Sequence, residues 1–380
     1  MTRLLELLVS LLIVAALVIL VGVLLPSHGH LERSVDVPNP IRQIYDSLNT
    51  MRRFPDWSPE RRLDPLVTMK YSGERLGPGA RVEWSGNESV GKGSLTIASS
   101  IQDEQVKMDL DNDFAGVNKT YTIDLIPAEN GKTTKIVWSY DVDYGWDLFA
   151  RYAGLYIHGK PDANVQTALA SVSAMLASFP NVDYKDQDIQ VSEVTGVPVL
   201  VLPTKSPRTL DEVAEATAQA VTRIQAVMSR AGLTQNGPVR IVTSNWGDDS
   251  YAFDVAVPVN STSFSLDGST QQITAPVQTD MVGDLDAQPA ELTLGQRDDE
   301  GQLYVADNVR ARITYSGPVL TTEYTGSPAA LPLLRLQLKA FAETHGYFYS
   351  EMNGGRFWDE VTATSEEGEE TFKVYLPVEP

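Results

Sequence analysis

The sequence predicts an α+β protein in which an N-terminal transmembrane helix precedes two soluble domains. Three observations lead to this prediction. Residues 7–25 form an apolar run in which Ser10 is the one polar side chain. Short strand-like runs and amphipathic helices follow it, and the C-terminal half repeats one strand, helix, strand, strand pattern. At 380 residues the chain is longer than one hydrophobic core usually organises, so we expect two domains behind the leader.

Composition excludes several classes of site and partner. The chain has no cysteine, which removes disulfides, thiolate metal sites and cysteine nucleophiles. Its four histidines are scattered, so we expect neither a metal site nor a cofactor. With 30 basic and 50 acidic residues the net charge is −20, which argues against nucleic acid as a partner. From Asp186 onward the chain has 28 acidic and 12 basic residues, so we expect the second domain to favour cationic ligands.

The leader, residues 1–28, predicts a membrane anchor. The nineteen-residue run makes about 28 Å of helix, close to the roughly 30 Å hydrocarbon thickness of a bilayer. The run is as long as a full span and no small-x-small cleavage site follows it, which favours an uncleaved signal anchor over a cleaved signal peptide. Arg3 on one side nearly balances Arg33 and Arg42 on the other. We choose a single pass in a bacterial inner membrane, with periplasmic soluble domains, because the amino tail is short.

A first domain is expected over residues 31–182. Val35 and Val37 alternate with polar neighbours as in a strand, and residues 40–48 read as a short amphipathic helix with Asn39 as its N-cap. Residues 161–179 form a long Ala-rich helix with one apolar stripe. Between the helices five runs read as strands, with Asn130-Gly131 as a hairpin signal: residues 81–84, 94–99, 106–110, 120–126 and 134–140.

Several segments of this span form a recognisable set: residues 31–34 (LERS), 40–48, 54–59, 77–79 (GPG), 84–86 with Gly91 and Gly93, 132–139, and the long C-terminal helix. With these segments the span resembles the START-like family in its polyketide-cyclase (SRPBCC) branch. The resemblance implies a helix-grip fold with an apolar cavity between the sheet and its closing helix. Trp57 and Trp84 are then candidate ligand contacts, with ordinary core packing as the alternative. The span contains no nucleophile elbow and no phosphate-binding loop that would indicate catalysis.

A second domain is expected over residues 187–380, with an insertion at 260–303. Residues 252–259 (AFDVAVPV) recur as residues 371–378 (TFKVYLPV). The two expected helices, residues 210–231 and 327–345, are each followed by a glycine, which is a common residue just after a helix C-terminus. One strand, helix, strand, strand unit exposes an apolar sheet face. We therefore expect two units to pair about a pseudo-two-fold axis with a groove between them.

The segments of the duplicated βαββ arrangement that matter here are residues 251–259, the strand at Gly317, the helix at 327–346, residues 358–361 and the strand at 371–378. In these segments the chain resembles the GyrI-like family, the effector-binding domain also found in AraC- and MerR-type regulators. The resemblance implies a ligand groove with a late glutamate facing it, and Glu360 occupies that position.

Glu360 is therefore the central candidate for ligand binding. In a groove lined by Trp246, Tyr324, Tyr349 and Trp358, its carboxylate would suit a lipophilic cation through charge pairing and ring-face attraction. The leading hypothesis is a non-enzymatic, membrane-anchored binder of hydrophobic or cationic small molecules. Two alternatives stay open: a hydrolase of a lipophilic substrate with Glu360 as general base, and an envelope scaffold that binds another protein. The alternative to any of these roles is that Glu360 is an ordinary surface carboxylate in an acidic segment.

Overall fold

The computed structural model describes residues 2–128, 133–247, 249–276, 292–349, 356–366 and 368–379. Over these residues the chain is a mixed α+β protein with large antiparallel sheets, as predicted. It divides into two compact units, Met1–Lys185 with Glu343–Gly346 (unit 1) and Asp186–Ala342 with Tyr347–Pro380 (unit 2). The Asn130-Gly131 hairpin signal and residues 277–291 of the expected insertion lie outside the described residues.

The apolar leader forms helix α1 (Thr2–Leu24), so the predicted helix is confirmed. Its window Glu6–Leu24, 19 residues, is long and apolar enough to cross a membrane. Only 6% of that window is buried within the protein, which distinguishes it from a core helix.

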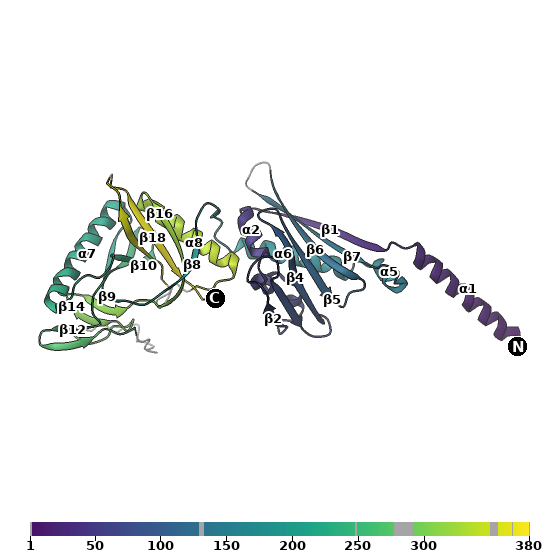
Figure 1. Ribbon diagram of the computed structural model, residues 1–380, viewed down its shortest axis with the longest axis horizontal. Coiled ribbons are helices and arrows are strands. Elements are labelled where there is room, and N and C mark those ends of the chain that lie inside the picture. Colours follow the sequence, from purple (N-terminus) through teal and green to yellow (C-terminus); the bar gives the residue numbers. More distant parts are fainter. Residues whose placement is uncertain are drawn as a thin grey trace. The chain divides into compact units, whose positions relative to one another are not determined.

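Unit 1 is built on a seven-stranded antiparallel sheet in the order β1-β7-β6-β5-β4-β3-β2 (Figure 1). Alternation places Val82, Leu95 and Leu110 on one rung of neighbouring strands, all buried on the same face. The five predicted strands are present, and β2 is an addition. The strands are β1 (His28–Val37), β2 (Thr68–Ser72), β3 (Arg81–Ser85), β4 (Lys92–Ile101), β5 (Gln105–Asn112), β6 (Val117–Pro127) and β7 (Thr134–Asp143).

Helices cover the apolar face of this sheet. The longest, α6, buries Val165, Leu169 and Val172 in the core and contacts β1 and β7. Asn39 is not the N-cap of α2: that position is Pro40, and the Asn39 amide donates to the Leu176 carbonyl at 3.0 Å. The helices are α2 (Ile41–Leu48), the 3₁₀ turn η1 (Met51–Arg53), α3 (Phe54–Trp57), α4 (Pro59–Leu63), α5 (Leu148–Gly154) and α6 (Lys160–Ala177).

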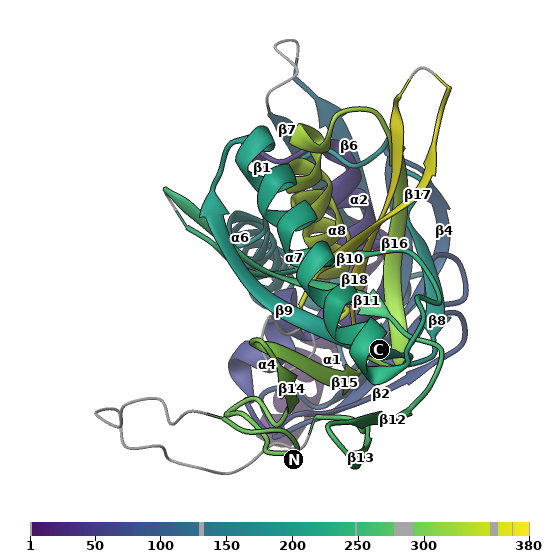
Figure 2. The same cartoon turned by 90° about the vertical axis from the view of Figure 1, so that its left-hand side faces the viewer.

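Unit 2 is built on a nine-stranded antiparallel sheet in the order β14-β15-β9-β11-β10-β17-β18-β16-β8. Figure 2 shows helix α7 lying across β9 and β11. Its strands are β8 (Gln190–Val194), β9 (Pro198–Pro207), β10 (Arg240–Trp246), β11 (Ser250–Pro258), β14 (Leu303–Ala306), β15 (Val309–Ile313), β16 (Gly317–Thr325), β17 (Trp358–Thr364) and β18 (Glu370–Pro377), with the separate hairpin β12 (Ser263–Leu266) and β13 (Ser269–Gln272). Its helices are α7 (Leu210–Ala231), the 3₁₀ turn η2 (Pro328–Ala330) and α8 (Leu331–His345).

The expected strand, helix, strand, strand order occurs twice in unit 2, as β9-α7-β10-β11 and β16-α8-β17-β18. Both helices end at a glycine in the left-handed region, Gly232 (φ 67°) and Gly346 (φ 71°). In the sheet the strands run β9-β11-β10 and then β17-β18-β16, an order that is symmetric about the β10–β17 pair. The assignment of this unit to the GyrI-like family stays a prediction.

The unit 2 sheet has two differently covered faces. Leu200 and Phe253 face α7, and Leu320 and Phe372 face α8, so both helices cover the same face. The opposite face, called here the groove face, carries a smaller apolar cluster: Val199, Val201, Val242, Ala256, Val319 and Trp358.

Candidate functional site

The groove face of unit 2 holds a concave site of about 460 Å³. This volume lies within the roughly 300 to 1,000 Å³ typical of small-molecule sites. The site is lined by residues of β10, β15 and β17, of the segments that follow β13 and β15, and of the segments that precede β14 and β17: Arg240, Val242, Ala275, Pro276, Glu300, Arg312, Ile313, Thr314, Tyr315, Ser316, Arg356 and Trp358.

Glu360 lies next to this groove and is 7% exposed. Its Oε1 atom is 2.7 Å from Nε of Arg240, and the indole N–H of Trp358 donates to the same oxygen at 3.3 Å. The Tyr375 hydroxyl donates to Oε2 at 3.5 Å. Burial, and then the Glu360 carboxylate, raise the pKa of Tyr375 to about 12, so the hydroxyl keeps its proton and stays a donor. The Glu360 carboxylate is therefore held by groups of the protein itself.

Strand register explains why these side chains meet. Arg240 is opposite Glu360 in the β10–β17 pair, and Trp358 is opposite Tyr375 in the β17–β18 pair. Trp358 and Glu360 are two residues apart on one strand and share a face. The rings of Trp358 and Tyr375 stack with centroids 4.7 Å apart and planes 10° apart. The stacked rings of Trp358 and Tyr375 therefore lie on the groove face, next to the ion pair of Arg240 and Glu360.

Three of the four aromatic residues expected around Glu360 do not lie there, which corrects the predicted groove. Tyr324 is opposite Phe372, so register places it on the helix-covered face, in the α8 cluster. Trp246 contacts Tyr251 edge-on at 4.7 Å, and Tyr251 belongs to the α7 cluster. Tyr349 also packs in the α8 cluster. Trp358 alone among the four shares the groove face with Glu360.

Five groove-face residues were not identified from the sequence: Arg240, Arg312, Tyr315, Arg356 and Tyr375. They come from four separate segments, and only strand pairing brings them together. The one usable signal is at Tyr375, which alternates with the buried Val374 and Leu376 inside the repeated segment 371–378 and therefore faces the other way.

The charges of the residues that line the groove differ from those expected of a cation-binding site. Three lining residues are arginines and one is a glutamate. Glu360, the carboxylate expected to attract a cation, is already paired with Arg240. A second cation at Glu360 would have to displace or share that guanidinium. The acidic excess of the second half of the chain therefore does not extend to the lining of this groove.

Arg312 is the least compensated of the three arginines. Its nearest carboxylate oxygen, on Asp254, is 3.8 Å away, and within the described residues its buried Nε has no hydrogen-bond partner. Asp254 is shared with Arg356, at 3.5 Å. Burial lowers the pKa of Arg312, and burial raises the pKa of Asp254 despite both arginines. Desolvation thus outweighs pairing, and the Arg312 guanidinium has donors to offer a ligand.

The neighbouring Asp359 lies on the opposite, helix-covered face of the sheet. It is 4% exposed and forms an ion pair with Arg335 of α8, while the Arg335 guanidinium also donates to the Tyr251 hydroxyl at 3.4 Å. This pair joins α8 to β17 and lies away from the groove. No group of three or more His, Asp or Glu side chains within the described ranges is placed to hold a metal ion.

In unit 1 the two predicted ligand-contact tryptophans are core residues. Trp57 is 1% exposed and meets Phe54 and Trp138 edge-on, with centroids 4.9 Å and 5.5 Å away. Trp84 stacks on Phe54 at 5.5 Å. The indole nitrogens of Trp57, Trp84 and Trp138 are buried and have no hydrogen-bond partner among the described residues. This interior therefore contains unused donors.

A buried carboxyl lies in the same unit. Oε2 of Glu60, on α4, is buried and lacks a hydrogen-bond partner in the described part of the chain. Desolvation raises the pKa of Glu60 to about 7, although the residue's own backbone N–H lowers it. The Glu60 charge in turn contributes, after burial, to the raised pKa of Tyr121, whose ring contacts Trp138 at 5.5 Å.

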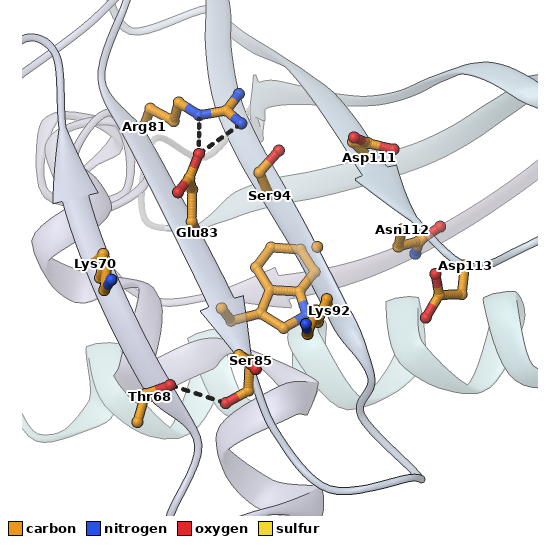
Figure 3. A pocket seen from close by; sticks show the side chains of 12 residues that line it. Thr68, Lys70, Arg81, Glu83, Ser85, Lys92, Ser94, Asp111, Asn112 and Asp113 are labelled. Carbon is orange, nitrogen blue, oxygen red and sulfur yellow. Dashed lines mark hydrogen bonds and ion pairs between the residues drawn. The ribbon is translucent and has the colours of Figure 1, made fainter.

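A depression of about 490 Å³ lies over β2 to β5 of unit 1 (Figure 3). Most of its lining belongs to the polar face of the sheet, where Glu83, Ser94 and Asp111 share a rung. The Arg81 guanidinium donates to Glu83 at 2.9 Å, as Figure 3 shows. Three basic and three acidic side chains balance in the lining. This polar surface differs from the apolar cavity expected between sheet and helix.

Comparison with known proteins gives partial likenesses. No family model and no curated protein matches the chain. Among solved structures, the Zhui aromatase/cyclase from Streptomyces sp. R1128 is 13% identical, with a TM-score of 0.32 over 40% of this chain and 94% of that one. A protein from Nitrosospira multiformis is 18% identical, with a TM-score of 0.30 over 39% and 97%. The EcmrR C-terminal domain is 12% identical, with a TM-score of 0.34 over 51% and 98%.

Proposed function

We propose that this chain is a membrane-anchored binding protein for amphiphilic small molecules, with the unit 2 groove as its ligand site. The observation that carries the proposal is the groove itself, in which the incompletely compensated Arg312 lies beside apolar and aromatic lining. Helix α1 would act as the anchor, and its length and composition support this role.

The lining indicates the chemistry of the ligand. Trp358, Val242 and Tyr315 offer an apolar surface for a flat or hydrocarbon body. Arg312 would bind a polar end that carries acceptors, and an anionic end best completes its charge, whereas Arg356 already pairs with Glu300 at 2.8 Å. Glu360 would act indirectly, since it holds Arg240 and the Trp358 indole in place. The expected cationic ligand is thus replaced by an amphiphile with an anionic or acceptor-rich end.

Both family resemblances enter the proposal at the level of fold. For unit 2, the GyrI-like assignment is supported by the strand order that is symmetric about β10 and β17. For unit 1, the START-like helix-grip assignment is supported by the seven-stranded sheet with α6 across it. A second, apolar ligand cavity in unit 1 would use the unpartnered indole donors of its interior.

Binding of naphthalene-2-sulfonate to the full chain in detergent micelles, measured by titration calorimetry, tests the groove. Arg312→Gln should weaken the affinity about tenfold, because one charge-assisted hydrogen bond is lost. The matched control is Arg230→Gln, which removes an exposed arginine of α7 that pairs with Asp307. Equal affinity of the Arg312 variant and wild type would contradict the proposal.

The same preparation separates the two alternatives. Turnover of 2-naphthyl acetate that Glu360→Gln abolishes would assign a hydrolase instead of a binder. A scaffold in which side chains fill the groove is disfavoured by its volume of about 460 Å³. Retention of a small molecule by the purified chain, detected by native mass spectrometry, would support the binding function directly.

A further inference from the structure

Helix α5 and its flanks expose a group of large apolar side chains, called here the α5 patch. Trp146 is 81% exposed and Phe149 88%, and Tyr156 is 76% exposed. Leu155 is exposed as well. Side chains of this size are rarely left in water together, because their apolar area is costly to solvate. None of these residues belongs to either site described above.

The patch is continuous with the apolar helix α1. The Tyr152 hydroxyl donates to the Val18 carbonyl at 2.6 Å, and the Arg151 guanidinium donates to the Val23 carbonyl at 2.9 Å. Gly22 permits this approach, since a Cβ there would lie 3.2 Å from Cβ of Leu148. Figure 1 shows α5 beside the end of the sheet from which α1 leaves. α5 therefore packs along the last turns of the apolar window.

The contacts with α1 place α5 along the apolar window and so indicate its depth in a bilayer. Val18 precedes Leu24, the end of the apolar window, by six residues, which is about 9 Å of helix. Interfacial helices typically bury their apolar face about 5 to 10 Å into the boundary between headgroups and acyl chains. With α1 in a bilayer, the Tyr152 hydroxyl would reach this boundary, and the neighbouring exposed rings would contact lipid.

We propose that the α5 patch is a lipid-binding surface that inserts into the same bilayer as α1 and seats unit 1 on it. The inference rests on the proposed anchor function of α1. Trp and Tyr are the residues that favour the membrane interface, because one end of each ring system is apolar and the other is polar. The Arg151 guanidinium lies 5.2 Å from the Trp146 ring, so a cation–π contact can hold this ring at the membrane interface.

The polar groups around the patch are compatible with this position. Asp147, the acid between two of the rings, caps α5 by accepting from the Ala150 N–H at 3.1 Å. Arg151 also donates to the Leu25 carbonyl at 3.2 Å, which satisfies an acceptor just beyond the C-terminus of α1. Val117, 61% exposed, adds apolar surface at the same end of the sheet, since it pairs with Asp143.

Depth-dependent fluorescence quenching tests the inference on the full chain. The chain is reconstituted into phosphatidylcholine vesicles whose acyl chains carry bromine at carbons 6 and 7 or at carbons 11 and 12. Wild type should lose emission in both, and more with the shallower bromine. Trp146→Phe should remove most of that loss. The matched control is Trp246→Phe, which removes a partly exposed tryptophan of unit 2 and should leave the loss unchanged.

Vesicle flotation distinguishes a failure of the α1 anchor from a failure of the α5 patch as a lipid surface. A chain that floats with the vesicles but shows no bromolipid quenching keeps its anchor and overturns the α5 patch as a lipid surface. Quenching that persists in Trp146→Phe overturns it too. A chain that does not float overturns both the anchor and the inference that depends on it.

Discussion

The Glu60 carboxyl should make the stability of unit 1 fall as pH rises. Its pKa lies at about 7 instead of the usual 4.5, because burial disfavours the charged form. One pKa unit corresponds to about 1.36 kcal/mol, so the difference between the two values corresponds to about 3 kcal/mol. Glu60→Gln removes the ionisation while keeping the shape and polarity of the side chain.

The direction follows from proton binding in the two states. Between pH 4.5 and about 7 the folded protein holds a proton on Glu60 that the unfolded chain has released. Stability is therefore greatest below the lower value and is lost progressively up to the higher one. We expect wild type to lose about 3 kcal/mol from this group between pH 4 and pH 8, and Glu60→Gln to lose none of that amount.

Hydrogen exchange followed by mass spectrometry, in micelles, can measure the pH dependence of stability within unit 1. The opening free energy of β6 peptides, corrected for intrinsic exchange at each pH, is compared between wild type and Glu60→Gln. Glu88→Gln, a change at an exposed glutamate of the same unit, is the matched control and should follow wild type. If wild type and Glu60→Gln share one pH dependence, the Glu60 carboxyl is not desolvated and the reasoning is wrong.

Three other single substitutions, one of them also combined with Arg240→Gln, have defined consequences for thermal unfolding. Gly93→Ala should destabilise unit 1 by about 1 to 3 kcal/mol, because its Cβ would lie 2.3 Å from Cζ2 of Trp84 and 2.6 Å from the Asp111 carbonyl oxygen. An unchanged melting temperature would show that both the ring and the backbone of β5 shift without cost. Glu360→Gln should cost about 3 kcal/mol in unit 2, since the partly buried Arg240 keeps its charge without its carboxylate partner. The additional change Arg240→Gln should recover part of that loss. Gly232→Ala should cost about 1 kcal/mol through its φ of 67° alone, because nothing lies within 4 Å of the new Cβ; a larger loss would point to a clash.

Local patterns were sufficient to predict much of the fold. Helix α7 begins and ends where its apolar spacing and Gly232 place it, and Leu210–Ala231 matches the predicted range. Gly346 likewise follows the end of α8. The repeated segments 252–259 and 371–378 lie in strands β11 and β18. These elements depend on residues close in sequence, so periodicity and helix-end signals suffice.

The groove could not be predicted in the same way, because strand register decides its membership. Tyr324 and Trp358 are both aromatic, but their registers place them on opposite faces of one sheet. Arg240 and Glu360 are far apart in sequence and meet only because β10 pairs with β17. Helix α5 was missed as well, since seven residues are too few to show a helical period.

The most direct test of the proposed ligand chemistry compares two ligands of the same shape and opposite charge. Naphthalene-2-sulfonate and trimethyl(2-naphthyl)ammonium are titrated into the full chain at low salt. The arginine-lined groove predicts that the sulfonate binds at least about tenfold more tightly than the ammonium compound, because the buried Nε of Arg312 has no acceptor among the described residues and its nearest carboxylate oxygen is 3.8 Å away. Equal or tighter binding of the ammonium compound would contradict this account and would support the cation site at Glu360 that the sequence alone predicts.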